Sequence, residues 1–125
     1  MEISHLDHLV LTVSDLQVTV DFYQRVLGMK PIEFGDGRLA LSFGAQKINL
    51  HLSGSEFEPK ARRVQVGSAD LCFITNTPIA EVAEHIQAQG VMIEEGPLPR
   101  TGAIGKIVSV YIRDPDGNLI EVSNY

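Results

Sequence analysis

The stretch LDHLVLTV, residues Leu6 to Val13, decides how this chain folds. Its side chains alternate between two faces, as they do along a β-strand. One face holds Leu9, Leu11 and Val13, and the other holds His8, Val10 and Thr12. An aliphatic side chain packs into a buried strand more easily than an imidazole does. His8 is therefore the first candidate for a functional residue.

A helix is predicted directly after this strand, over residues 15–27, with Ser14 as its N-cap and Gly28 just past its end. Short strands are then expected at residues 31–34, 38–43 and 47–53, which completes a βαβββ unit. In the second half, the same order is expected over residues 69–74 (strand), 77–89 (helix), 92–94, 107–113 and 118–124 (strands), with a long loop at 96–105.

The two halves share landmarks at a constant separation. His8 and Asp70, Asp15 and Thr77, and Gly28 and Gly90 are each 62 residues apart. Such agreement indicates a duplicated unit. We therefore predict an α+β fold for residues 1–125, a single domain made of two βαβββ modules, 1–53 and 67–125, joined by a linker at 54–66.

Composition excludes several classes of function. The chain has 44% hydrophobic and 21% charged residues, as a soluble globular protein does, with 16 acidic against 10 basic residues. Because no run of Lys or Arg occurs, nucleic acid is not an expected partner, and no apolar segment is long enough to span a membrane. The single cysteine, Cys72, precludes an internal disulfide and favours a reducing compartment, which we take to be the cytoplasm.

Each sheet has one face for its helix, and the opposite face collects polar residues. Four of these residues are potential metal ligands on the first and last strands of the modules: His8, His51, Asp70 and Glu121. Here Asp70 is the counterpart of His8, and His51 is assigned as the counterpart of Glu121. Imidazoles with carboxylates suit Zn²⁺, Ni²⁺, Mn²⁺ or Fe²⁺. Either these faces are simply solvated, or they bind one divalent transition metal.

The residue pattern also resembles a known family. DHLVL at residues 7–11, the Phe22-Tyr23 pair followed by Leu27-Gly28, and DPDGNLIE at residues 114–121 are similar to the vicinal oxygen chelate superfamily. This superfamily comprises glyoxalase I, thiol transferases, extradiol dioxygenases and bleomycin-binding proteins. The stretches EFEPKA (56–61) and GPLPRTGA (96–103) resemble its glyoxalase-domain proteins. The resemblance implies an open, eight-stranded, U-shaped sheet around a divalent metal, and a homodimer.

The resemblance further implies a mechanism in which the metal chelates two adjacent oxygens of a small substrate, such as a thiol adduct, and stabilises an enolate. Glu121 would then be both ligand and catalytic base. Candidate substrate-binding residues are Arg100, Thr101, Tyr111 and Arg113. The family mostly has histidine where this chain has Asp70, which leaves open whether Asp70 binds the metal, supports a ligand or leaves a coordination position free.

The leading expectation is thus a metal-dependent lyase or isomerase of lactoylglutathione-lyase type. An extradiol dioxygenase using Fe²⁺ is one alternative, supported by the set of two histidines and a carboxylate. The other is a protein that sequesters a small molecule without chemistry.

Overall fold

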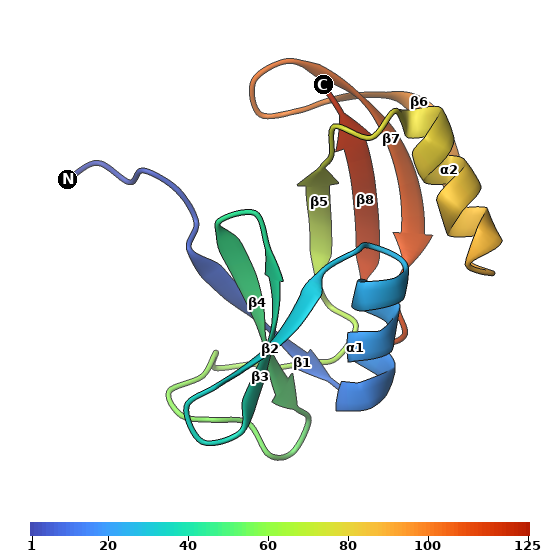
Figure 1. The fold of residues 1–125 in the computed structure, drawn as a ribbon. Helices are drawn as coiled ribbons and strands as arrows, with labels where there is room; N and C mark the ends of the chain where they lie inside the picture. Colours follow the sequence, from blue (N-terminus) through green and yellow to red (C-terminus); the bar gives the residue numbers. More distant parts are fainter. The chain divides into compact units, whose positions relative to one another are not determined.

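Each half of the chain forms a four-stranded sheet with one helix (Figure 1). The structure, a computed structural model, describes residues 1–125. The chain divides into two compact units, Met1–Val66 and Gly67–Tyr125. Both contain the order βαβββ, so the predicted α+β, glyoxalase-like fold with two βαβββ modules is confirmed.

The first unit begins with an extended tail that leads into the first strand (Figure 1). Its elements are β1 (His8–Val13), α1 (Leu16–Arg25), β2 (Lys30–Phe34), β3 (Arg38–Phe43) and β4 (Gln46–Leu52). The sheet order is β1-β4-β3-β2, in which β1 and β4 are parallel and the other pairs are antiparallel. The first and last strands of the unit are therefore direct neighbours.

The second unit repeats this arrangement. Its elements are β5 (Asp70–Ile74), α2 (Ile79–Ala88), β6 (Glu95–Thr101), β7 (Lys106–Arg113) and β8 (Leu119–Asn124). The sheet order is β5-β8-β7-β6, with β5 and β8 parallel. Figure 1 shows α2 lying along one side of this sheet.

The apolar core of each unit lies between its helix and its sheet. In the first unit α1 contacts β2, β3 and β4, and it buries Phe22 and Tyr23. On β4, Ile48 and Leu50 are buried at alternate positions, as the sequence pattern predicted. In the second unit Ile86 of α2 is buried in the same way. Because apolar residues occupy one sheet face, the polar residues at the intervening positions share the other.

The prediction that Ser14 caps the first helix is wrong. The N-cap is Asp15, whose Oδ1 accepts a hydrogen bond from the backbone N–H of Val18 at 3.0 Å. An aspartate caps as well as a serine does, and Asp15, directly before Leu16, has the extended backbone of an N-cap.

The region after α2 also differs from the prediction. A strand was expected near residues 92–94 and a loop over 96–105, but β6 spans Glu95–Thr101 and pairs with β7. Pro97 and Pro99 suggested a loop, because proline cannot donate to a sheet. They are tolerated since β6 is an edge strand with an irregularity between Glu95 and Leu98.

The predicted turn between β7 and β8 is confirmed, and side chains hold it. The Asp114 carboxylate accepts hydrogen bonds from the backbone N–H groups of Asp116 and Asn118, both at 2.9 Å, and from the side-chain amide of Asn118 at 2.7 Å. The side-chain oxygen Oδ1 of Asn118 accepts a hydrogen bond from the backbone N–H of Ala69 at 2.8 Å. This turn therefore ties the entry of β5 to the start of β8.

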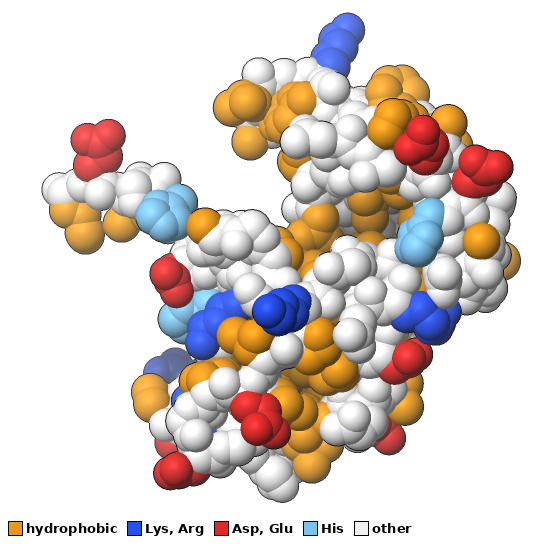
Figure 2. Space-filling model, viewed as in Figure 1, with side chains coloured by type: hydrophobic (Ala, Val, Ile, Leu, Met, Phe, Trp, Pro, Cys, Tyr) orange, Lys and Arg blue, Asp and Glu red, His pale blue; other side chains and the backbone are white.

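None of the helices is long and apolar enough to cross a membrane. Figure 2 shows acidic and basic side chains interspersed over the visible surface.

Candidate functional site

In the first unit, five polar side chains of β1 and β4 share the sheet face opposite α1: His8, Thr12, Lys47, Asn49 and His51. His8 of β1 stands opposite Lys47, and Thr12 stands opposite His51. Asn49 and His51 alternate with the core residues Ile48 and Leu50. His8 and His51 are thus on one face, but four residues apart along the strands, or about 13 Å. The structure does not bring these two histidines together.

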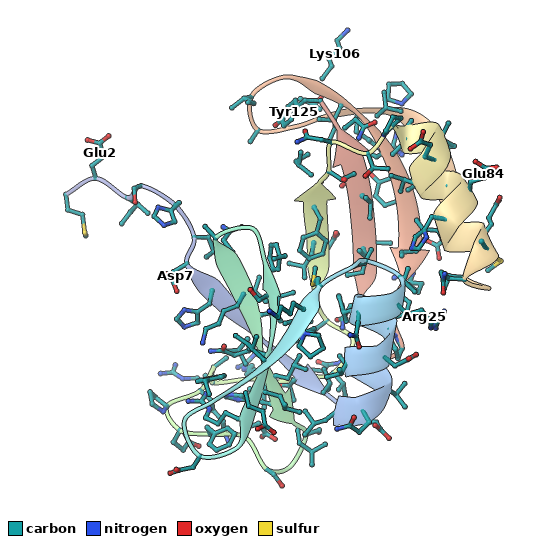
Figure 3. All side chains as sticks on the ribbon, viewed as in Figure 1. Glu2, Asp7, Arg25, Glu84, Lys106 and Tyr125 are labelled. Carbon is teal, nitrogen blue, oxygen red and sulfur yellow. The ribbon has the colours of Figure 1, made fainter.

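His8 is arranged as metal-binding histidines usually are. Its Nδ1 lies 2.7 Å from Oδ1 of Asp7, so the proton of the neutral ring belongs on Nδ1 and Nε2 carries the lone pair. Its hydrogen bond to His8 lowers the pKa of the Asp7 carboxyl below its ordinary value. Figure 3 shows Asp7 at the start of β1. The side chain of His8 is 46% exposed, so Nε2 is open to a ligand.

His51 has different surroundings. It is only 3% exposed, and its Nε2 lies 3.4 Å from Nη2 of Arg38. The ring of Phe57 packs edge-on against it, with centroids 5.4 Å apart. Burial, with Arg38 as the second cause, lowers the pKa of His51. A neutral ring whose Nε2 accepts from a guanidinium has its proton on Nδ1, which leaves no free lone pair for a metal.

The strand registers also change the internal correspondence between the units. Lys47 stands opposite His8, and Leu119 stands opposite Asp70. Two residues further along each last strand come Asn49 and Glu121, so Asn49 is the counterpart of Glu121. His51 corresponds to Ser123, which corrects the assignment made from the sequence. Asn49 is 6% exposed, and its Oδ1 has no hydrogen-bond partner.

In the second unit, Asp70 and Glu121 lie on the polar face of neighbouring strands. Glu121 stands opposite Cys72 on β5 and opposite Tyr111 on β7. Asp70 is two residues before Cys72, which is about 7 Å along the strand. The two carboxylates are therefore neighbours on one face.

Ser109 holds the Glu121 carboxylate. The Ser109 hydroxyl is fully buried and donates to Oε1 of Glu121 at 2.6 Å. It lies 2.7 Å from the hydroxyl of Ser123, which in turn lies 3.5 Å from Sγ of Cys72. This chain of hydroxyls fixes one oxygen of the carboxylate.

Arg100 and Tyr111, both predicted to bind substrate, are in contact. Nε of Arg100 donates to the Tyr111 hydroxyl at 3.0 Å, and the guanidinium lies 5.4 Å from the centre of the ring. Burial raises the pKa of Tyr111 above its ordinary value, Arg100 opposes this, and Glu121 adds to it. Tyr111 therefore stays a neutral hydroxyl beside Glu121.

The other two predicted substrate-binding residues are not part of this group. Arg113 forms a two-pronged ion pair with Glu94, with both nitrogen–oxygen distances at 3.0 Å, which lowers the pKa of Glu94. Thr101 stands opposite Lys106, whereas Arg100 stands opposite Ile107. Since neighbouring residues alternate, Thr101 lies on the opposite sheet face from Arg100 and Tyr111.

The donor set fits a divalent metal in its chemistry. Each unit offers a first-strand residue, His8 or Asp70, and an oxygen donor two residues along the last strand, Asn49 or Glu121. A carboxylate orients His8, and a hydroxyl orients Glu121, as is usual around metal ligands. Neither unit gathers three His, Cys, Asp or Glu side chains that could hold a metal ion.

Sequence reasoning missed three residues: Asp7, Arg38 and Asn49. Asp7 directly precedes His8, which was a usable signal. Arg38 and Asn49 gave none on their own, because an arginine at the start of a strand and an asparagine in the middle of one are common. Asn49 lies two residues before His51 on β4, and only the pairing of β3 with β4 brings Arg38 beside His51.

Comparison with known proteins agrees with the fold and the motifs. The profile of the Glyoxalase/Bleomycin resistance protein/Dioxygenase superfamily matches residues 5–122. A virulence protein of Salmonella typhimurium is 61% identical over 125 residues, which cover 100% of this chain and 87% of that protein. A lactoylglutathione lyase of Neisseria meningitidis is 31% identical, over 91% of this chain and 86% of the enzyme.

Among solved structures, an integron cassette protein from the mobile metagenome of V. cholerae superposes with a TM-score of 0.99. It is 66% identical, and the match covers 100% of this chain and 98% of that one. The sequence match, the paired βαβββ units and the DPDGN turn agree, and the chain belongs to the Glyoxalase/Bleomycin resistance protein/Dioxygenase superfamily.

Proposed function

We propose that this chain is a divalent-metal-dependent lyase or isomerase of glyoxalase type that acts on a small oxygenated substrate. The observation that carries the proposal is that a hydrogen bond holds the side chain of each of two proposed ligands, His8 and Glu121. Asp7 orients the His8 ring so that Nε2 is free, and Ser109 orients the Glu121 carboxylate. A solvated surface has no need of such fixed donors.

The proposed ligands are, within the first unit, His8 with Oδ1 of Asn49 as a further donor and, within the second unit, Asp70 and Glu121. Histidine and carboxylate ligands suit Zn²⁺, Ni²⁺, Mn²⁺ or Fe²⁺. The sequence-based expectation that His51 is also a ligand is not carried into this set, because its Nε2 faces Arg38. When bound, the metal would polarise adjacent substrate oxygens and stabilise the charge of an enolate.

Residues of the chain supply the remaining chemistry. The Glu121 oxygen that Ser109 does not hold accepts a proton from the substrate carbon. The Tyr111 hydroxyl, held neutral and fixed by Arg100, donates a hydrogen bond to a substrate oxygen. Arg100 adds a positive charge beside the same point.

The likeness to a lactoylglutathione lyase supports a substrate that is a thiol adduct of an α-oxo aldehyde. The direct test measures the metal content of protein purified without an affinity tag, and then assays reconstituted protein with methylglyoxal and glutathione. We expect about one metal per chain and turnover of the adduct. Metal below about a tenth of an equivalent, not recovered on reconstitution, would overturn the proposal. Oxygen uptake with catechols, and none with the adduct, would replace it with dioxygenase chemistry.

A further inference from the structure

Two N–H groups on the polar face of the first unit are buried without an acceptor. They are Nε–H of Arg38 and Nδ1–H of His51, whose residues flank the Leu39–Leu50 pair of β3 and β4 and are in contact. The proton of His51 is assigned to Nδ1 because Nε2 lies 3.4 Å from Nη2 of Arg38 and accepts from it. Buried donors nearly always have partners, so an acceptor is missing here.

The charge of Arg38 is also uncompensated. The guanidinium lies between two aromatic rings, 4.8 Å from the centre of Phe34 and 4.4 Å from that of Phe57. No carboxylate pairs with it. Glu56, whose negative charge raises the pKa of His51, is paired with Lys60 at 3.6 Å and accepts a hydrogen bond from the backbone N–H of Gly54.

A second cation adds to this imbalance. The Lys47 ammonium lies 3.7 Å from the centre of the Phe34 ring, so one ring contacts two positive groups. Partly buried cations normally occur with an anionic partner. The missing acceptor should therefore be negatively charged.

We propose that Arg38 and His51 bind the carboxylate group of a small organic acid. The planar guanidinium offers Nε–H to one carboxylate oxygen, and the imidazole Nδ1–H serves the other. Lys47 contributes its charge. None of these residues is a proposed metal ligand, so this binding goes beyond the proposed metal chemistry and does not depend on it.

The Phe57 ring packs against both donor residues. This ring contacts both Arg38 and His51, yet it is 43% exposed itself. It belongs to residues 53–69, which contain no helix or strand. We expect rotation of this half-exposed side chain to open the way for a ligand to both N–H groups.

The test follows the Arg38 Nε–H and His51 ring signals by NMR in protein treated with a chelator. Sodium acetate is titrated against sodium chloride at equal ionic strength, and inorganic phosphate forms a third arm. We expect saturable shifts of both signals with acetate and no saturation with chloride. Equal responses to acetate and chloride, or saturation by phosphate alone, would overturn the proposal. Chelation removes metal, so the outcome is separate from that of the metal proposal.

Variants locate the binding. Arg38→Met should weaken acetate binding at least about tenfold, as expected for a lost charge-assisted hydrogen bond. Arg38→Lys keeps the charge but loses Nε–H, and it serves as the second variant if Arg38→Met does not fold. Arg62→Gln, at an exposed arginine of the same unit, should bind acetate as the wild type does. Unchanged binding in folded Arg38→Met or Arg38→Lys would contradict the assignment.

Discussion

Nη2 of Arg38 lies 3.4 Å from Nε2 of His51, so a cation stabilises the neutral form of a buried imidazole. Burial is the larger cause and Arg38 the second, and both lower the pKa of His51 from 6.5. The unfolded chain therefore takes up a proton at this residue before the folded chain does.

This arrangement fixes the sign of a pH effect. As the pH falls below about 6.5, the unfolded state is favoured by protonation of His51, so the free energy of unfolding falls until the pH reaches the folded pKa. Urea unfolding of the wild type and of His51→Gln at pH values from 5 to 8 gives the free energy of unfolding of each protein as a function of pH. We expect the wild type to lose more stability than the variant on acidification. If the free energies of unfolding of the two proteins changed in parallel with pH, the pKa of His51 would not be lowered in the folded protein.

Asp7 should matter for metal binding although it is not a proposed ligand. Asp7→Ala removes the acceptor that holds His8 Nδ1–H, and the loss of such a partner costs about 10–100-fold in metal affinity. Glu2→Ala, also in the N-terminal tail (Figure 3), is the matched control. Competition titrations with a chromogenic chelator give both affinities. Equal affinities would show that His8 needs no orientation by Asp7.

In the second unit, Ser109 is the residue that holds a proposed ligand, Glu121, and its role can be tested by substitution. Ser109→Ala leaves Oε1 of Glu121 without its donor, and we expect turnover to fall more than substrate affinity, since the position of the base is affected. Ser53→Ala, at an exposed position after β4, should leave both unchanged. Steady-state kinetics separate kcat from KM. A change confined to KM would assign Ser109 to substrate binding instead.

Gly67 is required by the turn that starts the second unit. Its φ is +74°, and a Cβ there would collide with the backbone carbonyl oxygen of Asp116. Gly44, with φ of +52°, has open space around it. Chemical denaturation should therefore give a loss of about 1 kcal/mol for Gly44→Ala, from backbone strain alone, and above about 2 kcal/mol for Gly67→Ala. Similar losses for the two variants would show that the turn relaxes.

Much of the fold could be predicted from the sequence, because alternation and helix-end signals are local. The duplicated βαβββ order and the polar face both followed from them. The strand β6 did not, because Pro97 and Pro99 are acceptable only at a sheet edge, and edge position is set by the other strands.

The sequence predicted which sheet face each candidate site residue lies on, but not its position along the strand relative to the neighbouring strand. Parity placed His8, His51, Asp70 and Glu121 on polar faces, yet it could not say how far along a strand each lies. The pairing of β1 with β4 puts Asn49, not His51, in the position that corresponds to Glu121. The contact between Arg38 and the buried His51 depends on the β3–β4 register as well.

Metal titration of single variants tests the central claim most directly. Metal-free protein and the variants His8→Ala, Glu121→Ala, His51→Ala and His5→Ala are titrated with Zn²⁺ and Ni²⁺ in a calorimeter. We predict that His8→Ala and Glu121→Ala lose stoichiometric binding, while His5→Ala and His51→Ala keep it. Full stoichiometry in Glu121→Ala, or its loss in His51→Ala alone, would contradict this account of the site.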